Sequence, residues 1–224
     1  MTEDEQKLAA AKAAVEHIKD GMVVGLGTGS TAAKMVDLVG ERVKNGLDII
    51  AVPTSEATAR QAEALGIRVV GLDEVSVIDL TIDGTDEVDP EKRLIKGGGG
   101  AHLREKIVAS LSDRMIVIAE NKKMVGKLGA FKLPVEVIPF AAGALLPKME
   151  ALGSTPEIRM KDGQPFLTDE GNQIIDCAFG EIDDPEELAL TLSTTPGVVE
   201  HGLFIDYADL VLIGTDDGVK TFGG

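Results

Sequence analysis

Several residue types are scarce in this sequence, and each shortage excludes a class of protein or of site. Cys177 is the one cysteine among 224 residues, which excludes an internal disulfide and a zinc site built on cysteines. No apolar run approaches the ~18 residues that a membrane-spanning helix needs, and the acidic residues 1–7 are unlike a secretory signal. We therefore expect a cytoplasmic protein that does not associate with membranes and that buries its thiol.

Aromatic and basic residues are also few. Six Phe, one Tyr and no Trp leave the packing to small aliphatic residues, which is typical of a parallel α/β sheet buried on both faces. The 22 Lys and Arg face 38 Asp and Glu, a formal net charge of −16, and such an acidic surface repels nucleic acid. A phosphorylated ligand would then need a local basic pocket. His102 and His201 share no ligand spacing, so we expect no histidine metal site.

The apolar residues that are present fall into short runs separated by amphipathic stretches. Residues 2–5 form a capping-box pattern, and the apolar stripe that follows predicts a helix ending at Gly21. Strand, helix, strand, helix and strand then follow as far as residue 70, the order of a parallel doubly wound sheet. The strands predicted for this sheet are 22–26, 48–52, 67–70, 77–82, 115–119 and 209–213.

The second half of the chain has a different pattern. Its predicted order is strand, helix, strand, strand, helix and strand, which is the ferredoxin-like arrangement. These elements are expected at 133–138, 140–152, 155–160, 172–178, 185–192 and 198–204. The fold class is therefore α/β, a Rossmann-like, doubly wound, mostly parallel sheet with a smaller inserted ferredoxin-like α+β domain. The expected boundaries are 1–131 plus 205–224 for the first domain and 132–204 for the second.

A glycine-rich loop with hydroxyl side chains, Gly27–Thr31, follows the first predicted strand. Its glycines do not have the spacing of a dinucleotide loop, and no lysine precedes the hydroxyl as a Walker A motif requires. Two hydroxyls and the amides of a helix start suffice for one phosphate monoester. The alternative is a simple Ser/Thr helix cap.

Four acids lie in seven residues, Asp83–Asp89, at the end of another predicted strand. Position 3 of an EF-hand loop would fall on Thr85, so the calcium pattern fails. A magnesium site stays open as an alternative, although no ligand pattern supports it. Ligands of open α/β sheets bind beyond the carboxyl ends of strands. This favours a binding role over an ordinary Asp-Gly turn.

The segment Lys96–Lys106 places four glycines directly before a predicted helix at 101–112. Free N–H groups and the dipole at a helix start favour anions, and Glu105 lies about one turn into the helix. The alternative is a flexible turn followed by an ordinary amphipathic helix. Lys122 and Lys123 follow the strand 115–119, where they could hold a phosphate or an oxyanion, or lie in a solvated loop.

These motifs supply a carboxylate base, ammonium groups and a cradle for phosphate. The sequence offers no Ser/His/Asp set, no thiol paired with histidine and no dinucleotide loop. The residue types that remain fit proton transfer next to a carbonyl on a phosphorylated small molecule. A glutamate would take the proton while N–H donors and positive charge stabilise the enediolate oxygen.

Six segments, in order along essentially the whole chain, resemble the type A ribose-5-phosphate isomerase family. They are Gly27–Thr31, Asp83–Glu87, Lys96–Lys106, Leu133–Pro139, Pro196–Val199 and Leu212–Lys220. The resemblance implies interconversion of ribose 5-phosphate and ribulose 5-phosphate through an enediol(ate), without metal or cofactor, in the non-oxidative pentose phosphate pathway. One departure is Thr85, which stands where many relatives carry alanine.

The resemblance also implies roles for individual residues. Glu105 matches the proton acceptor, Asp83 and Asp86 match the aspartates that bind the sugar and assist ring opening, and Lys96 matches the group that polarises substrate oxygens. Substrate binding is expected at Lys7, Thr28, Gly29, Ser30, Thr31, Asp83, Gly84, Thr85, Asp86, Lys96, Gly97, Gly98, Gly99 and Lys123. The loop at 28–31 is assigned to the phosphate. Lys123 matches the family's substrate-binding lysine, and its neighbour Lys122 is the alternative match.

Two other classes of function stay open at this stage. A sugar-phosphate sensor would need an added helix-turn-helix, for which there is no room before Met22. A CoA transferase-like enzyme would use Glu105 covalently and would form an adduct with acyl-CoA. If the smaller domain exposes apolar surface, we expect a homodimer or a homotetramer.

Overall fold

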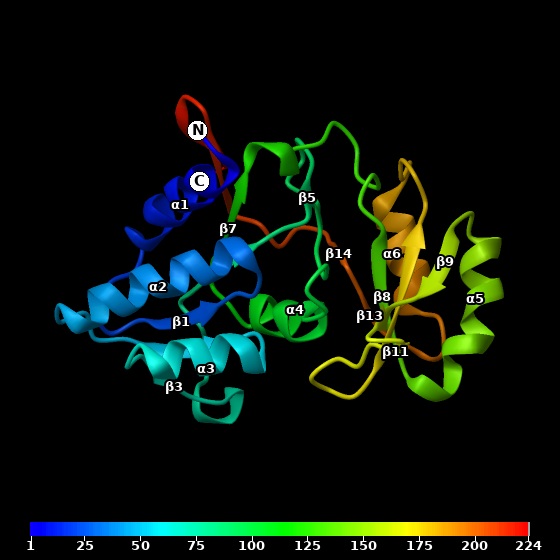
Figure 1. Cartoon of the computed structure of the whole chain (residues 1–224), viewed down its shortest axis with the longest axis horizontal. Helices are drawn as coiled ribbons and strands as arrows, with labels where there is room; N and C mark the ends of the chain where they lie inside the picture. Colours follow the sequence, from blue (N-terminus) through cyan, green and yellow to red (C-terminus); the bar gives the residue numbers. More distant parts are fainter. Residues whose placement is uncertain (224) are drawn as a thin grey trace. The chain divides into compact units, whose positions relative to one another are not determined.

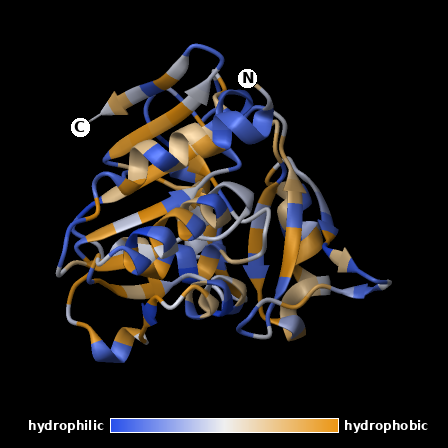
Figure 2. Ribbon diagram, turned by 60° about the vertical axis from the view of Figure 1, so that its left-hand side comes forward, coloured by the Kyte–Doolittle hydropathy of each residue, from blue (hydrophilic) through white to orange (hydrophobic). Residues whose placement is uncertain are grey.

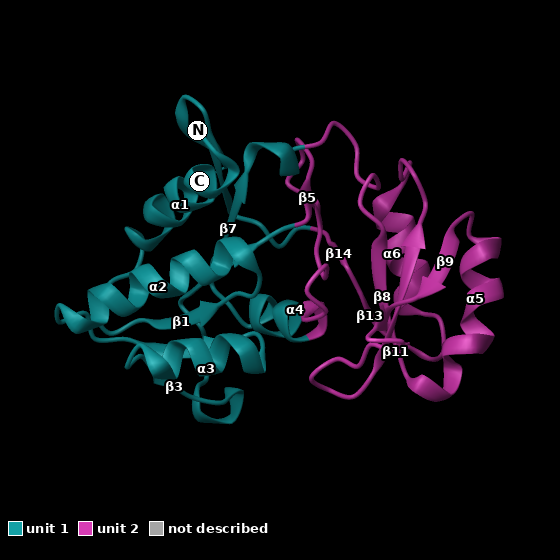
Figure 3. Cartoon of the chain, in the orientation of Figure 1, with its two compact units in different colours: residues 1–85, 104–124, 206–224 teal, residues 86–103, 125–205 magenta. Residues whose placement is uncertain are grey.

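The structure is a computed structural model that describes residues 1–223. It divides into two compact units, coloured separately in Figure 3. Unit 1 comprises residues 1–85, 104–124 and 206–224, and unit 2 comprises residues 86–103 and 125–205. Two of the motifs named above, Asp83–Glu87 and Lys96–Lys106, each contain a boundary between the units.

Unit 1, which carries the labels α1, α2, β1 and β7 in Figure 1, is built on a seven-stranded sheet. Its strand order is β16-β15-β7-β4-β1-β2-β3. Every neighbouring pair is parallel except β15 with β16. The strands are β1 (Val23–Leu26), β2 (Ile50–Pro53), β3 (Arg68–Val69), β4 (Leu80–Gly84), β7 (Met115–Glu120), β15 (Leu210–Thr215) and β16 (Gly218–Gly223). The predicted parallel sheet is confirmed, including the return of the C-terminal strand to it. The antiparallel edge strand β16 was not predicted.

Helices cover both faces of this sheet. Those of unit 1 are α1 (Glu3–Val15), α2 (Ser30–Lys44), α3 (Glu56–Ala64) and, from Arg104 onward, α4 (His102–Ser110). Alternate residues of a strand point to opposite faces, and β2 shows which helices lie where. Ala51 belongs to the core cluster that contains α1, α2 and α3 residues, whereas Val52 clusters with Val108 of α4. The helix α4 therefore covers the face opposite to the other three.

The sequence signals for helix starts in unit 1 operate as predicted. Thr2 and Glu5 form both halves of a capping box, and Ser55 accepts from the Thr58 amide to cap α3. Apolar residues, orange in Figure 2, run along the strands that these helices cover. Every residue of β4 and of β7 is buried, as expected for central strands of a parallel sheet.

Unit 2 contains a four-stranded antiparallel sheet with the order β13-β8-β12-β9. Its elements are β8 (Leu133–Val137), α5 (Ala142–Ala151), β9 (Thr155–Ile158), β12 (Gln173–Ala178), α6 (Pro185–Ser193) and β13 (Val198–His201). The strands thus follow the order 4-1-3-2, which is the ferredoxin-like topology. Cys177 is buried in this unit's core, and burial raises the pKa of its thiol to about 12.

The prediction of one strand at 198–204 is wrong. The chain leaves β13 at His201 and continues as β14 (Leu203–Phe204), which joins β6 (Leu94–Ile95) and β5 (Glu87–Val88) in a separate small sheet. Gly202 makes the transfer possible, because its amide donates to Pro134 O at 2.8 Å while its carbonyl accepts from Lys96 N at 2.9 Å. A Cβ at this position would overlap the Lys96 carbonyl.

The predicted α/β fold class is confirmed by these two units. The proposed domain at 132–204 lies within unit 2, and its separate status stays a prediction. Among residues 1–223, no helix is long and apolar enough to cross a membrane.

Candidate active site

The loop between β1 and α2 is held by a cluster of hydroxyl groups in unit 1. Thr28 Oγ1 lies 2.7 Å from Thr54 Oγ1, 2.9 Å from Ser55 Oγ and 3.1 Å from Thr58 Oγ1. Thr54 and Ser55 follow the carboxyl end of β2, so two neighbouring strand ends are joined here. Ser55 has the residue type typical of a helix cap, whereas nothing in the local sequence signals Thr54 or Thr58 as partners of Thr28.

The start of α2 has the features of an anion site. The residue before the helix is Gly29, with φ at 112° and no side-chain hydrogen bond to the helix amides. The alternative of a simple Ser/Thr cap is therefore wrong. Ser30 and Thr31 are the first two helical residues, where N–H groups lack intrahelical partners and the helix dipole favours negative charge. The loop offers amides and hydroxyls together, as a phosphate monoester requires.

Asp83 ties this loop to β4. Its side chain is fully buried, and Oδ1 accepts from the Thr28 amide at 3.0 Å and from the Gly84 amide at 2.7 Å. Both donors are backbone amides, so they fix the direction of the carboxylate. The carboxylate is therefore oriented at the carboxyl end of a central strand, the edge at which open α/β sheets bind their ligands.

Glu105 lies on α4 and is only 4% exposed. One turn further on, Val108 packs on β1, since a Cβ built on Gly25 would lie 2.8 Å from Val108 Cγ1. Residues three apart share one helix face, so Glu105 faces the sheet side as well. The short connection 111–114 makes α4 run opposite to β7. Glu105 is therefore displaced from Val108 toward the carboxyl ends of the strands. Asp83 lies in the same direction, because it follows Thr81 on β4 and Thr81 lies beside Val108 next to Gly25.

Two lysines of unit 1, Lys7 on α1 and Lys122 just after β7, converge on Glu3, the first residue of α1. Lys7 Nζ and Lys122 Nζ each donate to Glu3 at 2.6 Å, and these hydrogen bonds, that of Lys122 foremost, lower the pKa of the exposed Glu3 carboxyl to about 2. Lys7 is buried and Lys122 is exposed, while Lys123 is half-buried on the short helix η2 (Asn121–Lys123). The structure thus joins Lys7 to the segment that carries both candidate lysines.

The remaining predicted residues, apart from Thr85 in unit 1, belong to unit 2. Asp86 Oδ2 accepts from the Gly98 amide at 2.7 Å, which joins the aspartate motif to the glycine loop. Lys96 is 2% exposed, and its Nζ lies 5.4 Å from the centroid of the Phe204 ring, a cation–π contact. Gly98 and Gly99 are exposed, so their backbone is open to a ligand.

The other acids of the aspartate motif hold the backbone of unit 2. Glu87 accepts from the amides of Gly129 and Phe131 at 2.7 and 2.6 Å, and Asp89 binds the Arg93 side chain at 2.6 Å. Among residues 1–223, no group of three or more His, Cys, Asp or Glu side chains is arranged to hold a metal ion. Glu87 and Asp89 therefore hold the structure of unit 2.

The structure brings the predicted residues together in two sets, one in each unit. Unit 1 joins the loop at 28–31 to Asp83 and Gly84, places Glu105 toward the same strand ends, and links Lys7 to the segment at 121–123. Unit 2 joins Asp86 to the glycine loop at 97–100, which Lys96 directly precedes in the chain. Each set combines a carboxylate with amide donors and an ammonium group.

Comparisons with known proteins agree with this arrangement. A family model described as ribose 5-phosphate isomerase A (phosphoriboisomerase A) matches residues 50–218. The chain is 52% identical over 228 residues to ribose-5-phosphate isomerase A of Rhodopseudomonas palustris (strain HaA2), covering 99% of this chain and 98% of the relative.

Solved structures are similar over the whole chain. A D-ribose-5-phosphate isomerase in complex with phospho-erythronic acid superposes with a TM-score of 0.98 at 43% identity, and 100% of both chains is covered. Ribose 5-phosphate isomerase A from Methanocaldococcus jannaschii gives a TM-score of 0.95 at 43% identity, again over 100% of both chains.

An α/β fold with these strand-end carboxylates, matched along its length by such relatives, defines an aldose–ketose isomerase. Its particular family follows from the same comparisons. The chain belongs to the ribose 5-phosphate isomerase A family, and the family resemblance stated from the sequence is confirmed.

Proposed function

We propose that this chain interconverts D-ribose 5-phosphate and D-ribulose 5-phosphate by proton transfer through an enediol(ate), as a step of the non-oxidative pentose phosphate pathway. The observation that carries the proposal is the buried Glu105 carboxylate on α4, displaced toward the strand ends where Asp83 anchors the Thr28 loop. A relative with 43% identity was solved with phospho-erythronic acid, a phosphorylated sugar acid with an anionic group at its other end.

Glu105 is the general base in this proposal. It removes the proton from C2 of the open-chain aldose and returns it to C1. Burial to 4% exposure limits competition from water for the carboxylate, and a positioned base contributes about 10²–10⁴-fold to the rate. No other group is required to carry the proton between the two carbons.

The oxygens of the substrate need stabilisation as negative charge develops on them. Lys96 and the amides of Gly97 to Gly99 supply positive charge and N–H donors for this purpose. Asp83 and Asp86 bind sugar hydroxyls and assist ring opening, since each carboxylate is already oriented by backbone amides.

The phosphate binds to the loop at 28–31. Thr28, Ser30 and Thr31 supply hydroxyls and the start of α2 supplies amides. Lys7 and Lys123 add positive charge, which an acidic protein with a formal net charge of −16 needs locally. Gly84 and Thr85 complete the set as parts of the aspartate loop.

A homodimer or homotetramer is proposed as the working form, in the cytoplasm and without metal or cofactor. Large apolar side chains of unit 2 support the association, among them Phe140 at 97% exposure and Leu190 at 66%, because exposed apolar patches mark interaction surfaces. Light scattering behind gel filtration tests the assembly, and a monomer at micromolar concentration would refute it.

The activity itself is tested by following conversion of ribose 5-phosphate by the purified chain. We expect ketose formation that reaches the same equilibrium from either sugar phosphate. A chain that leaves both sugars unchanged, although folded by circular dichroism, would refute the proposal. Incubation with acyl-CoA, followed by mass spectrometry of the intact protein, tests the covalent alternative at Glu105.

A further inference from the structure

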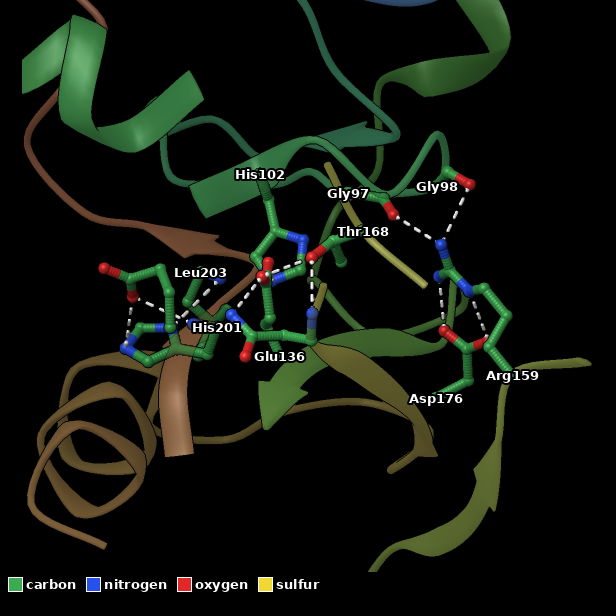
Figure 4. A network of polar contacts seen from close by, with 11 residues as sticks. Gly97, Gly98, His102, Glu136, Arg159, Thr168, Asp176, His201 and Leu203 are labelled. Atoms are coloured by element: carbon green, nitrogen blue, oxygen red, sulfur yellow. Dashed lines mark hydrogen bonds and ion pairs between the residues drawn. The ribbon is translucent and has the colours of Figure 1, made fainter. Parts of the chain in front are cut away.

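The glycine loop of unit 2 is held by an ion pair, Arg159 with Asp176, whose residues lie far from the loop in the sequence. Arg159 follows β9, and its Nε and Nη2 donate to the two carboxylate oxygens of Asp176 on β12 at 2.8 and 2.5 Å. The remaining nitrogen, Nη1, donates to Gly97 O at 2.9 Å and to Gly98 O at 3.2 Å. Figure 4 shows the guanidinium between the carboxylate and the two carbonyls.

These contacts decide which way the loop peptides face. A peptide unit is planar and trans, so its C=O and its N–H point in opposite directions. The peptide that joins Gly97 to Gly98 is held at both ends, because Arg159 binds its oxygen and Asp86 Oδ2 accepts from its N–H at 2.7 Å. In the next peptide Arg159 binds the Gly98 oxygen, which turns the Gly99 N–H away from the guanidinium.

The loop has one hydrogen bond of its own, from the Gly100 amide to Gly97 O at 3.0 Å, and Arg159 clamps it from outside. Glycine takes both signs of φ at little cost, and Gly97 and Gly100 have φ values of 103° and 79°. A Gly-Gly peptide can therefore rotate unless its oxygen is bound. Phe166 supports the same clamp, since its ring centroid lies 5.8 Å from Arg159 Cζ and its edge fills the space that a Cβ on Gly100 would need.

The clamp is nearly neutral and mostly covered. The side chains of Arg159 and Asp176 are each 15% exposed, and the bidentate pair cancels its own charge. Arg159 therefore adds little to the general attraction of an anionic substrate. Arg159 acts on geometry instead. It fixes the direction of the Gly98 and Gly99 amides, and the Gly98 amide in turn orients the Asp86 carboxylate.

We propose that Arg159, held by Asp176, is a positioning residue for the isomerisation. By fixing the carbonyls of Gly97 and Gly98 it keeps the Gly98 N–H on the Asp86 carboxylate and presents the Gly99 N–H to a substrate oxygen. The inference rests on the proposed function, because Asp86 and the loop amides are the groups that would touch the sugar. Arg159 acts only through them.

The test is steady-state kinetics with ribose 5-phosphate for the wild type, Arg159→Lys and Asp176→Asn. Lysine keeps the charge but cannot bind a carboxylate through two nitrogens while also bridging two carbonyls. We expect kcat to fall about 10- to 100-fold in Arg159→Lys, the size of effect that a small misplacement of catalytic groups produces. KM should change less than about threefold, because the loop at 28–31 that would bind the phosphate belongs to unit 1, whereas Arg159 belongs to unit 2.

A matched control exists in unit 1. Arg42 also donates through its guanidinium to two backbone carbonyls, those of Val15 and Ile18, but these carbonyls belong to the end of α1. Arg42→Lys should lower the melting temperature without the loss in kcat. Equal losses of kcat in Arg42→Lys and Arg159→Lys would overturn the positioning role.

Chemical rescue separates positioning from folding. Arg159→Ala should regain part of its kcat when low millimolar guanidinium is added, because the ion can occupy the emptied space, whereas an unfolded chain would not recover. If Arg159→Ala does not fold, Arg159→Lys decides alone. A kcat for Arg159→Lys within about twofold of wild type overturns the clamp, and a folded wild type without isomerase activity overturns the proposed function as well.

Discussion

Two glycine-containing loops precede helices in this chain, one in each unit, and they are held in different ways. The loop at 27–31 is held by near neighbours of the same sheet edge, namely the hydroxyls after β2 and the Asp83 carboxylate after β4. The loop at 97–100 is held by Arg159, which is 62 residues away from Gly97 and is itself held by Asp176.

The difference indicates a division of work. A loop fixed by the framework of a parallel sheet suits binding of a phosphate, which needs only a constant set of amides and hydroxyls. A loop of consecutive glycines suits close approach of the backbone to reacting oxygens, and it then needs separate support to keep its amides aimed. The first loop should therefore control KM and the second should control kcat.

The largest effect should come from the proposed base Glu105, which lies on α4 and outside both loops. Glu105→Gln removes the proton acceptor and keeps the shape of the side chain, so kcat should fall by about 10²–10⁴-fold while KM changes less than about threefold. Glu63→Gln makes the same change on an exposed position of α3 and should leave turnover unchanged. Near-normal turnover by Glu105→Gln would remove the central role assigned to it.

The next effect tests the first loop. Thr28→Val removes the hydroxyl that lies within 3.1 Å of three others, and KM for ribose 5-phosphate should rise about tenfold, corresponding to roughly 1.4 kcal/mol. The kcat should stay within about threefold of wild type. Thr155→Val, at an exposed strand position of unit 2, is the control. A fall in kcat without a rise in KM would break the proposed division between the loops.

A smaller effect concerns the packing beneath the glycine loop. Glu136 is buried and accepts from Thr168 Oγ1 at 2.8 Å and from Asn172 Nδ2 at 3.0 Å, and its Oε2 lies 3.8 Å from Nε2 of His102, the first residue of α4 (Figure 4). Burial raises the pKa of the Glu136 carboxyl above its ordinary 4.5, and the charges of Glu170 and Glu200 add to the shift.

The sign of the resulting pH dependence follows directly. Because the folded pKa is raised, the unfolded chain releases this proton first, so the stability that Glu136 contributes is complete below pH 4.5 and is lost as pH rises through the folded pKa. Glu136→Gln cannot titrate. Its free energy of unfolding relative to wild type should increase as pH rises from 4.5 through the folded pKa of Glu136, by about 1.4 kcal/mol for each unit of pKa difference.

Urea unfolding at several pH values measures this difference. Glu150→Gln, on an exposed position of α5, should show no such trend. A difference between Glu136→Gln and wild type that is constant with pH would contradict the account of the buried carboxyl.

The smallest expected effect is that of chelation. Together the two loops and the lysines Lys7, Lys96 and Lys123 present amides, hydroxyls and ammonium groups, which would bind a phosphorylated sugar without a metal ion. Turnover should therefore be unchanged after dialysis against EDTA. A loss of activity that magnesium restores would contradict a route that uses only the protein's own groups.

The sequence predicts more of the first loop's surroundings than of the second loop's, and the reason is physical. The Gly27–Thr31 motif, the Ser55 cap and the buried strands depend on local spacing, which the chain displays. The clamp of Arg159 and Asp176 depends on how the ferredoxin-like unit folds under the glycine loop, and nothing adjacent to Arg159 signals its partners. Gly202 is similar, since a change of sheet within one apolar run leaves no periodic signal.

The most direct test of the central claim is isomerisation of ribose 5-phosphate in D₂O, followed by NMR of the ribulose 5-phosphate formed. A proton carried by the Glu105 carboxylate can exchange with solvent, so the wild type should place deuterium at C1, and Glu105→Gln should lose this incorporation together with turnover. Equal incorporation by Glu105→Gln, together with turnover at the wild-type rate, would contradict a proton transfer through Glu105.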